Sequence, residues 1–151
     1  MLTAGERAPE FTLPDDAGKD RSLTDFLNYG NTVLYFYPAD FTPGCTRQAC
    51  SLRDLHDELK KANLLVVGIS PQSPESHARF RMKHGLPFAL LSDQDKAVAK
   101  MYGVAGPLGI GVRRATFLVD GSRRIQDAVL ADFRIARHTE FVRKAIMCNP
   151  R

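Results

Sequence analysis

One segment joins an apolar run to the start of a helix, and it reads Thr32-Val33-Leu34-Tyr35-Phe36-Tyr37-Pro38-Ala39-Asp40-Phe41-Thr42-Pro43-Gly44-Cys45-Thr46. Its first six residues are mostly β-branched or aromatic and do not alternate with polar residues, which predicts a central strand covered on both faces. Pro38 ends this strand. Thr42 and Pro43 are residue types preferred at the N-cap and at the first position of a helix. Cys45 is therefore expected in the first helical turn.

The rest of the chain extends this strand and helix into a larger sheet. A segment of helical period runs from about Pro43 to Lys61 and leads to a second apolar run, Leu64 to Ile69, which together predict a βαβ unit with parallel strands. Turn and capping residues predict the remaining elements: a helix after Ser73-Pro74 that ends at Gly85, a strand at 88–91, a helix from a 92–95 cap through Tyr102, a hairpin of strands 115–119 and 125–129, and a helix at about 138–147. The fold class expected is α/β, a central mixed sheet flanked by helices.

Composition and charge narrow the class of protein. The 151 residues contain no repeat or long linker, so a single domain, 1–151, is expected. The net charge of +4 comes from scattered basic pairs, which argues against nucleic-acid binding. No apolar run approaches the length needed to cross a bilayer and no signal-peptide pattern is present, so we expect no membrane association and a cytoplasmic location. In that compartment the three cysteines are expected to be reactive, metal-binding or incidental rather than a disulfide framework.

Cys45 lies where a thiolate is stabilised, but only in part. The start of a helix offers unpaired N–H groups and the positive end of the helix dipole. Lowering a thiol pKa from about 8.5 to about 6 requires roughly 3.4 kcal/mol, whereas a helix terminus supplies about 0.3–1 and at most about 2 kcal/mol. A strong nucleophile here therefore needs a cation, and we expect it from Arg113 or Arg114. The alternative is that Cys45 is a small buried core residue.

Cys50 differs from Cys45 in its position on the helix. At 100° per residue, Cys50 falls among charged residues on the face opposite the apolar stripe, which favours reactive chemistry over packing. The two cysteines are five residues apart, about 7.5 Å along an intact helix, and bridged cysteines rarely have Cα atoms beyond about 7 Å. A disulfide between them requires the first helical turns to unwind. The apolar stripe consists of Cys45, Ala49, Leu52, Leu55, Leu59 and Ala62.

The segment resembles a known family. Pro38, Thr42 and Cys45 match the Pro-x-x-x-Thr-x-x-Cys signature of peroxiredoxins, and the same segment followed by Cys50 is similar to the bacterioferritin-comigratory, or Q-type, subfamily. The resemblance covers nearly the whole chain and implies a thioredoxin-like fold with N-terminal additions. It also implies a thiol-dependent peroxidase that uses no metal or organic cofactor. Further matching segments are 8–13, 68–70, 92–93 and 114–120.

The resemblance assigns roles to the residues of the segment. Cys45 would be the peroxidatic cysteine, which attacks a hydroperoxide and becomes a sulfenic acid. Thr42 and Gly44, with N–H groups of the helix start, would bind the substrate. Arg114, rather than Arg113, would stabilise the thiolate and the transition state. Pro38 would shield the site from water.

The second half of the cycle is implied in the same way. Cys50 would resolve the sulfenic acid as an intramolecular Cys45–Cys50 disulfide, which thioredoxin or a similar dithiol would reduce. An intrachain disulfide needs no partner subunit, so a monomer is expected. Two positions depart from the subfamily: Gln48 stands where a glutamate is usual, so any ion pair to the arginine would become a neutral hydrogen bond, and Cys148 is interpreted as an incidental surface thiol.

Two alternatives share the same residues. A general thiol-disulfide exchanger would reduce protein disulfides and turn over little peroxide, although it would leave Pro38, Thr42 and Arg114 without a reason. A redox-sensing or chaperone-like binding protein would use helix unwinding to expose an interaction surface. The rate of Cys45 oxidation by peroxide distinguishes both alternatives from a peroxidase.

Overall fold

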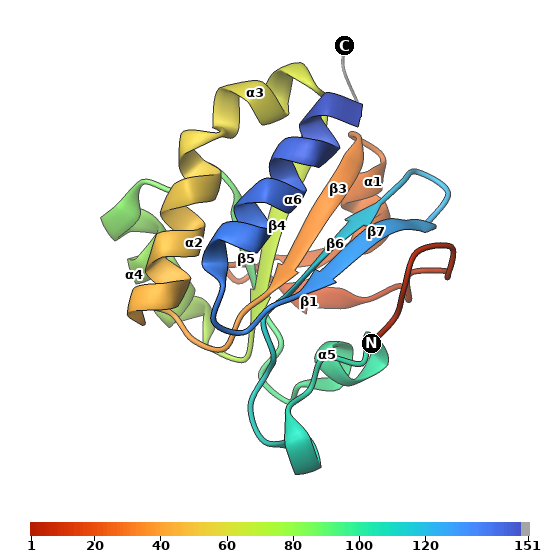
Figure 1. Ribbon diagram of the computed structural model, residues 1–151. Coiled ribbons are helices and arrows are strands. Elements are labelled where there is room, and N and C mark those ends of the chain that lie inside the picture. Colours follow the sequence, from red (N-terminus) through yellow and green to blue (C-terminus); the bar gives the residue numbers. More distant parts are fainter. Residues whose placement is uncertain (149–151) are drawn as a thin grey trace.

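The structure, a computed structural model, describes residues 1–148, and residues 149–151 lie outside the described part of the chain (Figure 1). Its elements include seven strands and six α-helices. In chain order they are β1 (Thr12–Pro14), β2 (Asp20–Ser22), α1 (Leu23–Leu27), β3 (Asn31–Phe36), α2 (Pro43–Asp54), α3 (His56–Lys61), β4 (Leu64–Ser70), α4 (Pro74–His84), β5 (Ala89–Ser92), α5 (Ala97–Met101), the 3₁₀ turn η1 (Pro107–Gly109), β6 (Ala115–Val119), β7 (Ile125–Leu130) and α6 (Ile135–Cys148).

A five-stranded mixed sheet forms the centre of the molecule. The strand order is β5-β4-β3-β6-β7. β3, β4 and β5 are parallel, whereas β6 runs antiparallel to both β3 and β7. The predicted βαβ unit, the predicted hairpin and the α/β fold class with a mixed sheet are therefore confirmed.

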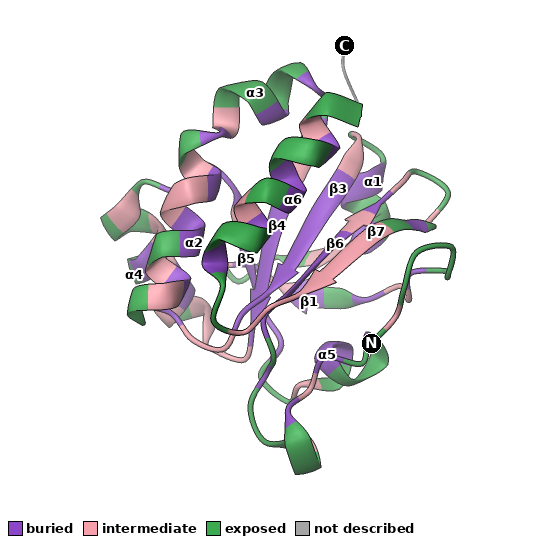
Figure 2. Ribbon diagram, viewed as in Figure 1, coloured by how far each residue is buried: buried purple, intermediate pink, exposed green. Residues whose placement is uncertain are grey.

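The central strand β3 is buried on both faces, as its sequence predicts (Figure 2). Leu34 and Phe36 belong to one core, which is closed by the N-terminal segment, α1 and α5. Val33, Tyr35 and Tyr37 belong to a second core, which is closed by α2, α3, α4 and α6. Two layers of helices thus fix the end of β3, from which the chain enters α2.

The prediction of one continuous helix from 43 to 61 is wrong at its middle. The chain forms α2 and α3 with a break at Leu55, whose N–H bonds to the carbonyl of Leu52 in a tight i−3 turn. Leu52, Leu55 and Leu59 all remain buried, so the break bends the chain around the sheet without losing the apolar face. Neither proline nor glycine marks the break, which is why periodicity alone did not predict it.

Two further helices differ in their bounds from the expectation. The helix expected through Tyr102 is reduced to α5, and Asp93 accepts hydrogen bonds from the N–H groups of Val98 and Ala99 as a capping residue should. The last helix begins at Ile135 rather than at about 138 because Ile135 packs into the interior.

The N-terminal region contains elements that the sequence analysis did not assign. β1 and β2 form a small antiparallel sheet, and α1 follows directly. Ser22 and Asp25 form a capping box at the start of α1, each side chain accepting from the backbone N–H of the other residue. The Ser-x-x-Asp spacing is the sequence signal that indicates this helix.

Two kinds of structural feature are missing from residues 1–148. No helix there is both long and apolar enough to span a membrane. Nor do those residues bring together three or more His, Cys, Asp or Glu side chains in a group able to hold a metal ion.

Gly68 in β4 gives the first testable prediction. A Cβ atom there would lie 2.8 Å from Leu90 Cδ2 and from the ring of Tyr35, the residue paired with Gly68 on β3. Gly68→Ala should therefore lower the free energy of unfolding by about 1–3 kcal/mol through overpacking. Urea unfolding measures this. Gly121→Ala is the matched control, because a Cβ at Gly121 meets nothing within 4 Å, and equal losses in both variants would contradict the explanation.

Candidate active site

Cys45 lies at the start of α2, beyond the carboxyl end of β3. Residues 37–42 connect the two elements, and Thr42 has the extended backbone of an N-cap, φ −73° and ψ 150°. Pro43 is the first helical residue, as expected. Cys45 follows in the first turn and is only 1% exposed. The ligand-binding edge typical of an open α/β sheet therefore coincides with this cysteine.

The first turn of α2 leaves its hydrogen-bond donors free. The Thr42 side chain does not cap the helix; its hydroxyl donates instead to the carbonyl of Ala39, at 3.2 Å. The first helical bond runs from the N–H of Thr46 to the carbonyl of Thr42. Within residues 1–148, the N–H groups of Gly44 and Cys45 meet no acceptor. These two donors and the exposed Thr42 hydroxyl can bind an oxygen-containing ligand.

Arg114 brings a positive charge to the sulfur of Cys45. Its guanidinium donates from Nη2 to Cys45 Sγ at 3.3 Å and from Nη1 to Gln48 Oε1 at 2.7 Å. The side chain is buried, only 6% exposed. Arg113 points elsewhere and pairs with Asp132 at 2.9 Å. Of the two arginines that the sequence offered, Arg114 is thus the one at the cysteine.

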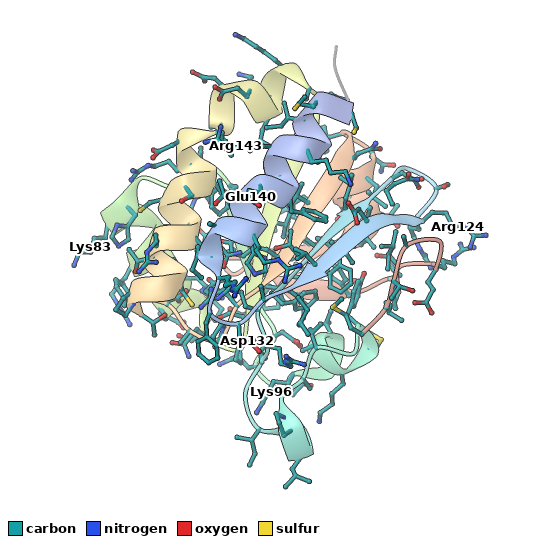
Figure 3. The ribbon with its side chains drawn as sticks, viewed as in Figure 1. Lys83, Lys96, Arg124, Asp132, Glu140 and Arg143 are labelled. Atoms are coloured by element: carbon teal, nitrogen blue, oxygen red, sulfur yellow. The ribbon has the colours of Figure 1, made fainter. Side chains whose placement is uncertain are left out.

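Asp132, which the sequence analysis did not identify, holds the two arginines in place. Figure 3 labels Asp132 among the side chains of the molecule. The Asp132 Oδ1 accepts from the backbone N–H of Arg114 at 3.0 Å, and the Asp132 carbonyl accepts from the guanidinium Nε at 3.4 Å. Burial by itself would raise the pKa of Asp132, but the hydrogen bonds from Arg114 and Arg113 and their charges hold it below its usual range. Asp132 lies in a loop between β7 and α6, where only the fold brings it near β6.

Gln48 and Gly44 shape the surroundings of the guanidinium. Gln48 is 1% exposed and accepts the neutral hydrogen bond that the sequence analysis anticipated at this position. Its Nε2 is buried without a partner among the described residues. A Cβ at Gly44 would lie 3.2 Å from Arg114 Nη2, so a glycine lets the helix approach the guanidinium closely. Pro38 is half-buried at the start of the 37–42 connection.

Cys50 is not on a fully solvated face, so that expectation is wrong in part. The thiol is half-buried beneath the end of α4, with Sγ 3.9 Å from His84 Nδ1. The pattern of one helix could not reveal α4, which packs on this side of it. All three cysteines are free, and Cys148 is exposed at the end of α6. The bond between Cys45 and Cys50 that the resemblance implies is therefore not formed in this state.

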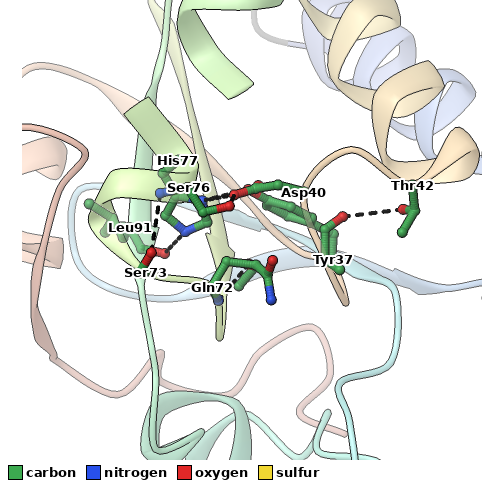
Figure 4. A network of polar contacts seen from close by, with 10 residues as sticks. Tyr37, Asp40, Thr42, Gln72, Ser73, Ser76, His77 and Leu91 are labelled. Atoms are coloured by element: carbon green, nitrogen blue, oxygen red, sulfur yellow. Dashed lines mark hydrogen bonds and ion pairs between the residues drawn. The ribbon is translucent and has the colours of Figure 1, made fainter. Parts of the chain in front are cut away.

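A buried polar network fixes the connection that precedes α2, and the sequence analysis missed it (Figure 4). Asp40 accepts from the Tyr37 hydroxyl and the Ser76 hydroxyl, each at 2.7 Å, and lies 2.7 Å from His77 Nδ1. His77 Nε2 donates to the carbonyl of Leu91 at 3.1 Å, because that oxygen can only accept. The 2.7 Å between Asp40 Oδ2 and His77 Nδ1 also fits an ion pair, which forms when the imidazole is protonated.

The pKa of Asp40 reflects this pairing. Burial alone would raise it, but the hydrogen bond and charge of His77, together with the hydrogen bonds of Tyr37 and Ser76, outweigh burial and place the pKa below its ordinary value. The ionised carboxylate therefore stabilises the folded state. Asp40 joins the 37–42 connection to α4, and His77 joins both to β5.

Asp40→Asn should lower the free energy of unfolding by about 1–3 kcal/mol near neutral pH, since a buried donor loses its charged acceptor. Because the folded pKa of Asp40 is lowered, the contribution is complete above the ordinary value of about 3.9 and is lost as the pH falls through the folded value. The difference between wild type and variant should thus shrink below about pH 4. Urea unfolding across a pH series measures this, with exposed Asp57→Asn as the control. A difference that stays constant with pH would exclude the ionic contribution.

One protein family, a relative in Escherichia coli and two solved structures are similar to this chain over most of its length. Residues 4–128 match the AhpC/TSA family. The chain is 47% identical over 147 residues to the peroxiredoxin Bcp of Escherichia coli strain K12, covering 93% of each chain. Among solved structures, the peroxidoxin BcpB of Mycobacterium tuberculosis matches with a TM-score of 0.92 and 35% identity over 98% of both chains. The bacterioferritin comigratory protein of Xanthomonas campestris, studied for its alkyl peroxide reduction activity, matches with a TM-score of 0.83 and 30% identity over 91% of this chain and 90% of that one.

Fold and site together define a cysteine-dependent oxidoreductase of thioredoxin-like architecture. The match over 125 of 151 residues and the identity to several relatives are more specific than the fold alone. The chain belongs to the AhpC/TSA family and, within it, to the peroxiredoxins of the bacterioferritin-comigratory or Q type. It is accordingly a thiol-dependent peroxidase, as its segment 38–50 predicted.

Proposed function

We propose that Cys45 is the peroxidatic cysteine, a role carried by the hydrogen bond from Arg114 Nη2 to its sulfur at 3.3 Å. The thiolate attacks the outer oxygen of a hydroperoxide, forming an S–O bond while the O–O bond breaks. The leaving hydroxide or alkoxide takes up a proton and departs as water or an alcohol. Cys45 is left as a sulfenic acid.

The neighbouring residues bind the substrate and stabilise the developing charge. The free N–H groups of Gly44 and Cys45 and the hydroxyl of Thr42 hold the two peroxide oxygens in line with the sulfur. Arg114 stabilises first the thiolate and then the charge that moves onto the leaving oxygen. Pro38, half-buried at the start of the 37–42 connection, limits access of water.

The cycle then continues through Cys50, the resolving cysteine. Its sulfur attacks the sulfenic sulfur of Cys45, giving an intramolecular disulfide and water. The first turn of α2 has no side-chain cap, which favours the unwinding that this bridge requires. Thioredoxin or a similar dithiol returns both cysteines to the thiol form.

We extend the proposal to the substrates, the oligomeric state and the cellular compartment. Hydrogen peroxide and organic hydroperoxides are the substrates, and the alkyl peroxide reduction activity of the related Xanthomonas campestris protein supports the organic class. The protein acts as a monomer, because both cysteines lie on one chain. It acts in the cytoplasm, where a reducing pool regenerates the thiols.

Replacing Cys45 by serine should abolish peroxide consumption, because a hydroxyl is far less nucleophilic than a thiolate at neutral pH. Peroxide loss in the presence of a dithiol reductant measures this. Cys148→Ser is the matched control, since that thiol is exposed at the far end of α6, and it should retain wild-type turnover.

One equivalent of peroxide should also give a Cys45–Cys50 bridge in wild type, detectable by mass spectrometry of peptides. A bridge through Cys148, or retained turnover without Cys45, would refute the assignment. A Cys45 oxidation rate equal to that of an ordinary thiol would likewise favour one of the non-peroxidase alternatives.

Replacing Arg114 by glutamine should lower the second-order rate of Cys45 oxidation by about 10²–10³, the usual effect of removing one charge-stabilising donor. The rate is measured by rapid mixing with peroxide, alkylation of the remaining thiols at increasing times, and mass spectrometry of the protein. Arg113→Gln removes the same charge from the neighbouring residue, whose guanidinium contacts Asp132 rather than Cys45, and should cost only a few-fold. Equal effects of the two substitutions would show that general charge, not the contact, is responsible.

A further inference from the structure

We propose that His84 is the proton acceptor that activates Cys50 for the resolving step. The inference rests on the proposed role of Cys50 and adds a residue that neither the sequence pattern nor the comparisons assigned. His84 Nδ1 lies 3.9 Å from Cys50 Sγ, within the range of a hydrogen bond to sulfur. The helix-start donors and Arg114 serve Cys45, whereas Cys50 lies one and a half turns further along α2.

Two contacts hold His84 against Cys50. Arg53, on α2, donates from Nη1 to the His84 carbonyl at 2.7 Å and so ties the end of α4 to α2. The Phe80 ring meets the imidazole edge-on, with the ring centroids 5.2 Å apart. His84 is half-buried as a residue, so part of it remains in contact with solvent. The pair is therefore positioned by two side chains, Arg53 on α2 and Phe80 on α4.

The resolving step begins with the transfer of one proton. His84 Nδ1 takes the proton from the Cys50 thiol, and the resulting thiolate attacks Cys45 Sγ. An S–S bond forms as the S–O bond of the sulfenic acid breaks, and the leaving hydroxide gains a proton to become water. Cys50 is oxidised and the Cys45 sulfur is reduced, with the hydroperoxide of the first step as the only oxidant.

His84 contacts Cys50 while α2 is intact, so the proton acceptor is already in position before the helix unwinds. The uncapped turn that carries Cys45 then unwinds and brings the sulfenic acid toward Cys50 and the neighbouring imidazole. An ordinary thiol is only a few per cent ionised at pH 7, so complete ionisation gains at most roughly thirtyfold in rate. We therefore expect His84 to contribute about tenfold to disulfide formation.

The test separates oxidation of Cys45 from disulfide formation in a single turnover. Reduced protein in a Cys148→Ser background is mixed with peroxide, quenched in acid at increasing times, and its sulfenic and disulfide forms are counted by intact mass. His84→Ala should slow disulfide formation about tenfold and leave the first phase close to wild type. Because the sulfenic acid then persists, excess peroxide should convert more Cys45 to sulfinic acid.

Controls distinguish base chemistry from packing. Added imidazole should restore the disulfide rate of His84→Ala, which a purely structural role would not allow. His84→Gln preserves more of the side-chain volume and should be slowed equally. His56→Ala removes another half-buried histidine, on α3, and should change neither phase nor respond to imidazole.

Each outcome decides one claim. A wild-type protein that never forms the Cys45–Cys50 bridge would refute the proposed function of Cys50. A bridge that forms equally fast in wild type and in both His84 variants would refute the role of His84 alone. Slowing of the His84 variants without imidazole rescue, or equal slowing by His56→Ala, would show that packing rather than proton transfer is responsible.

Discussion

The hydrogen bond between Arg114 and Cys45 is the interaction on which the site depends, and the register of the sheet produces it. Phe36 at the end of β3 pairs with Ala115 at the start of β6, so Arg114 lies beside the point where the chain leaves β3 for α2. The two residues are 69 positions apart in sequence. A buried guanidinium is costly unless it is paired, and within residues 1–148 no carboxylate contacts it. The two side-chain atoms that its Nη atoms contact are Gln48 Oε1 and Cys45 Sγ, so a negative charge on the sulfur would pair directly with it.

The start of α2 has two requirements that conflict. In the proposed cycle it must hold Cys45 firmly against Arg114, yet it must unwind when Cys45 meets Cys50. The structure separates these demands, because the 37–42 connection is anchored through Asp40 and His77 to α4 and β5 rather than through the hydrogen bonds of α2 itself. The first turn of the helix can open while the residues before it stay in place. An N-cap side chain would stabilise this turn by about 1 kcal/mol and would oppose that motion.

The sequence predicted correctly the strands and helix starts that depend on residues close together in the chain. The β3 run, the position of Thr42 before Pro43 and the parallel pairing with β4 follow from residue types and spacing, and the structure confirms them. The sequence could narrow the cation to two adjacent arginines but needed a resemblance to choose between them. Asp132, His77 and His84 escaped notice because each acts through an element far along the chain. The break at Leu55 escaped because packing against the sheet, not a helix-breaking residue, causes it.

Gln48 leaves the positive charge of Arg114 free to act on Cys45, at the expense of some stability of the fold. A glutamate at this position would give Arg114 a permanent anionic partner, which would compete with the thiolate for the same guanidinium. The neutral amide oxygen orients Nη1 at 2.7 Å and leaves the positive charge uncompensated toward Cys45. The cost is visible in the Gln48 Nε2 donor, which is buried without an acceptor among the described residues. Such an orphaned group destabilises a fold by about 1–3 kcal/mol. A charge-assisted hydrogen bond to a thiolate is worth about 1.5–3 kcal/mol, so the loss in folding and the gain at the nucleophile are of the same size.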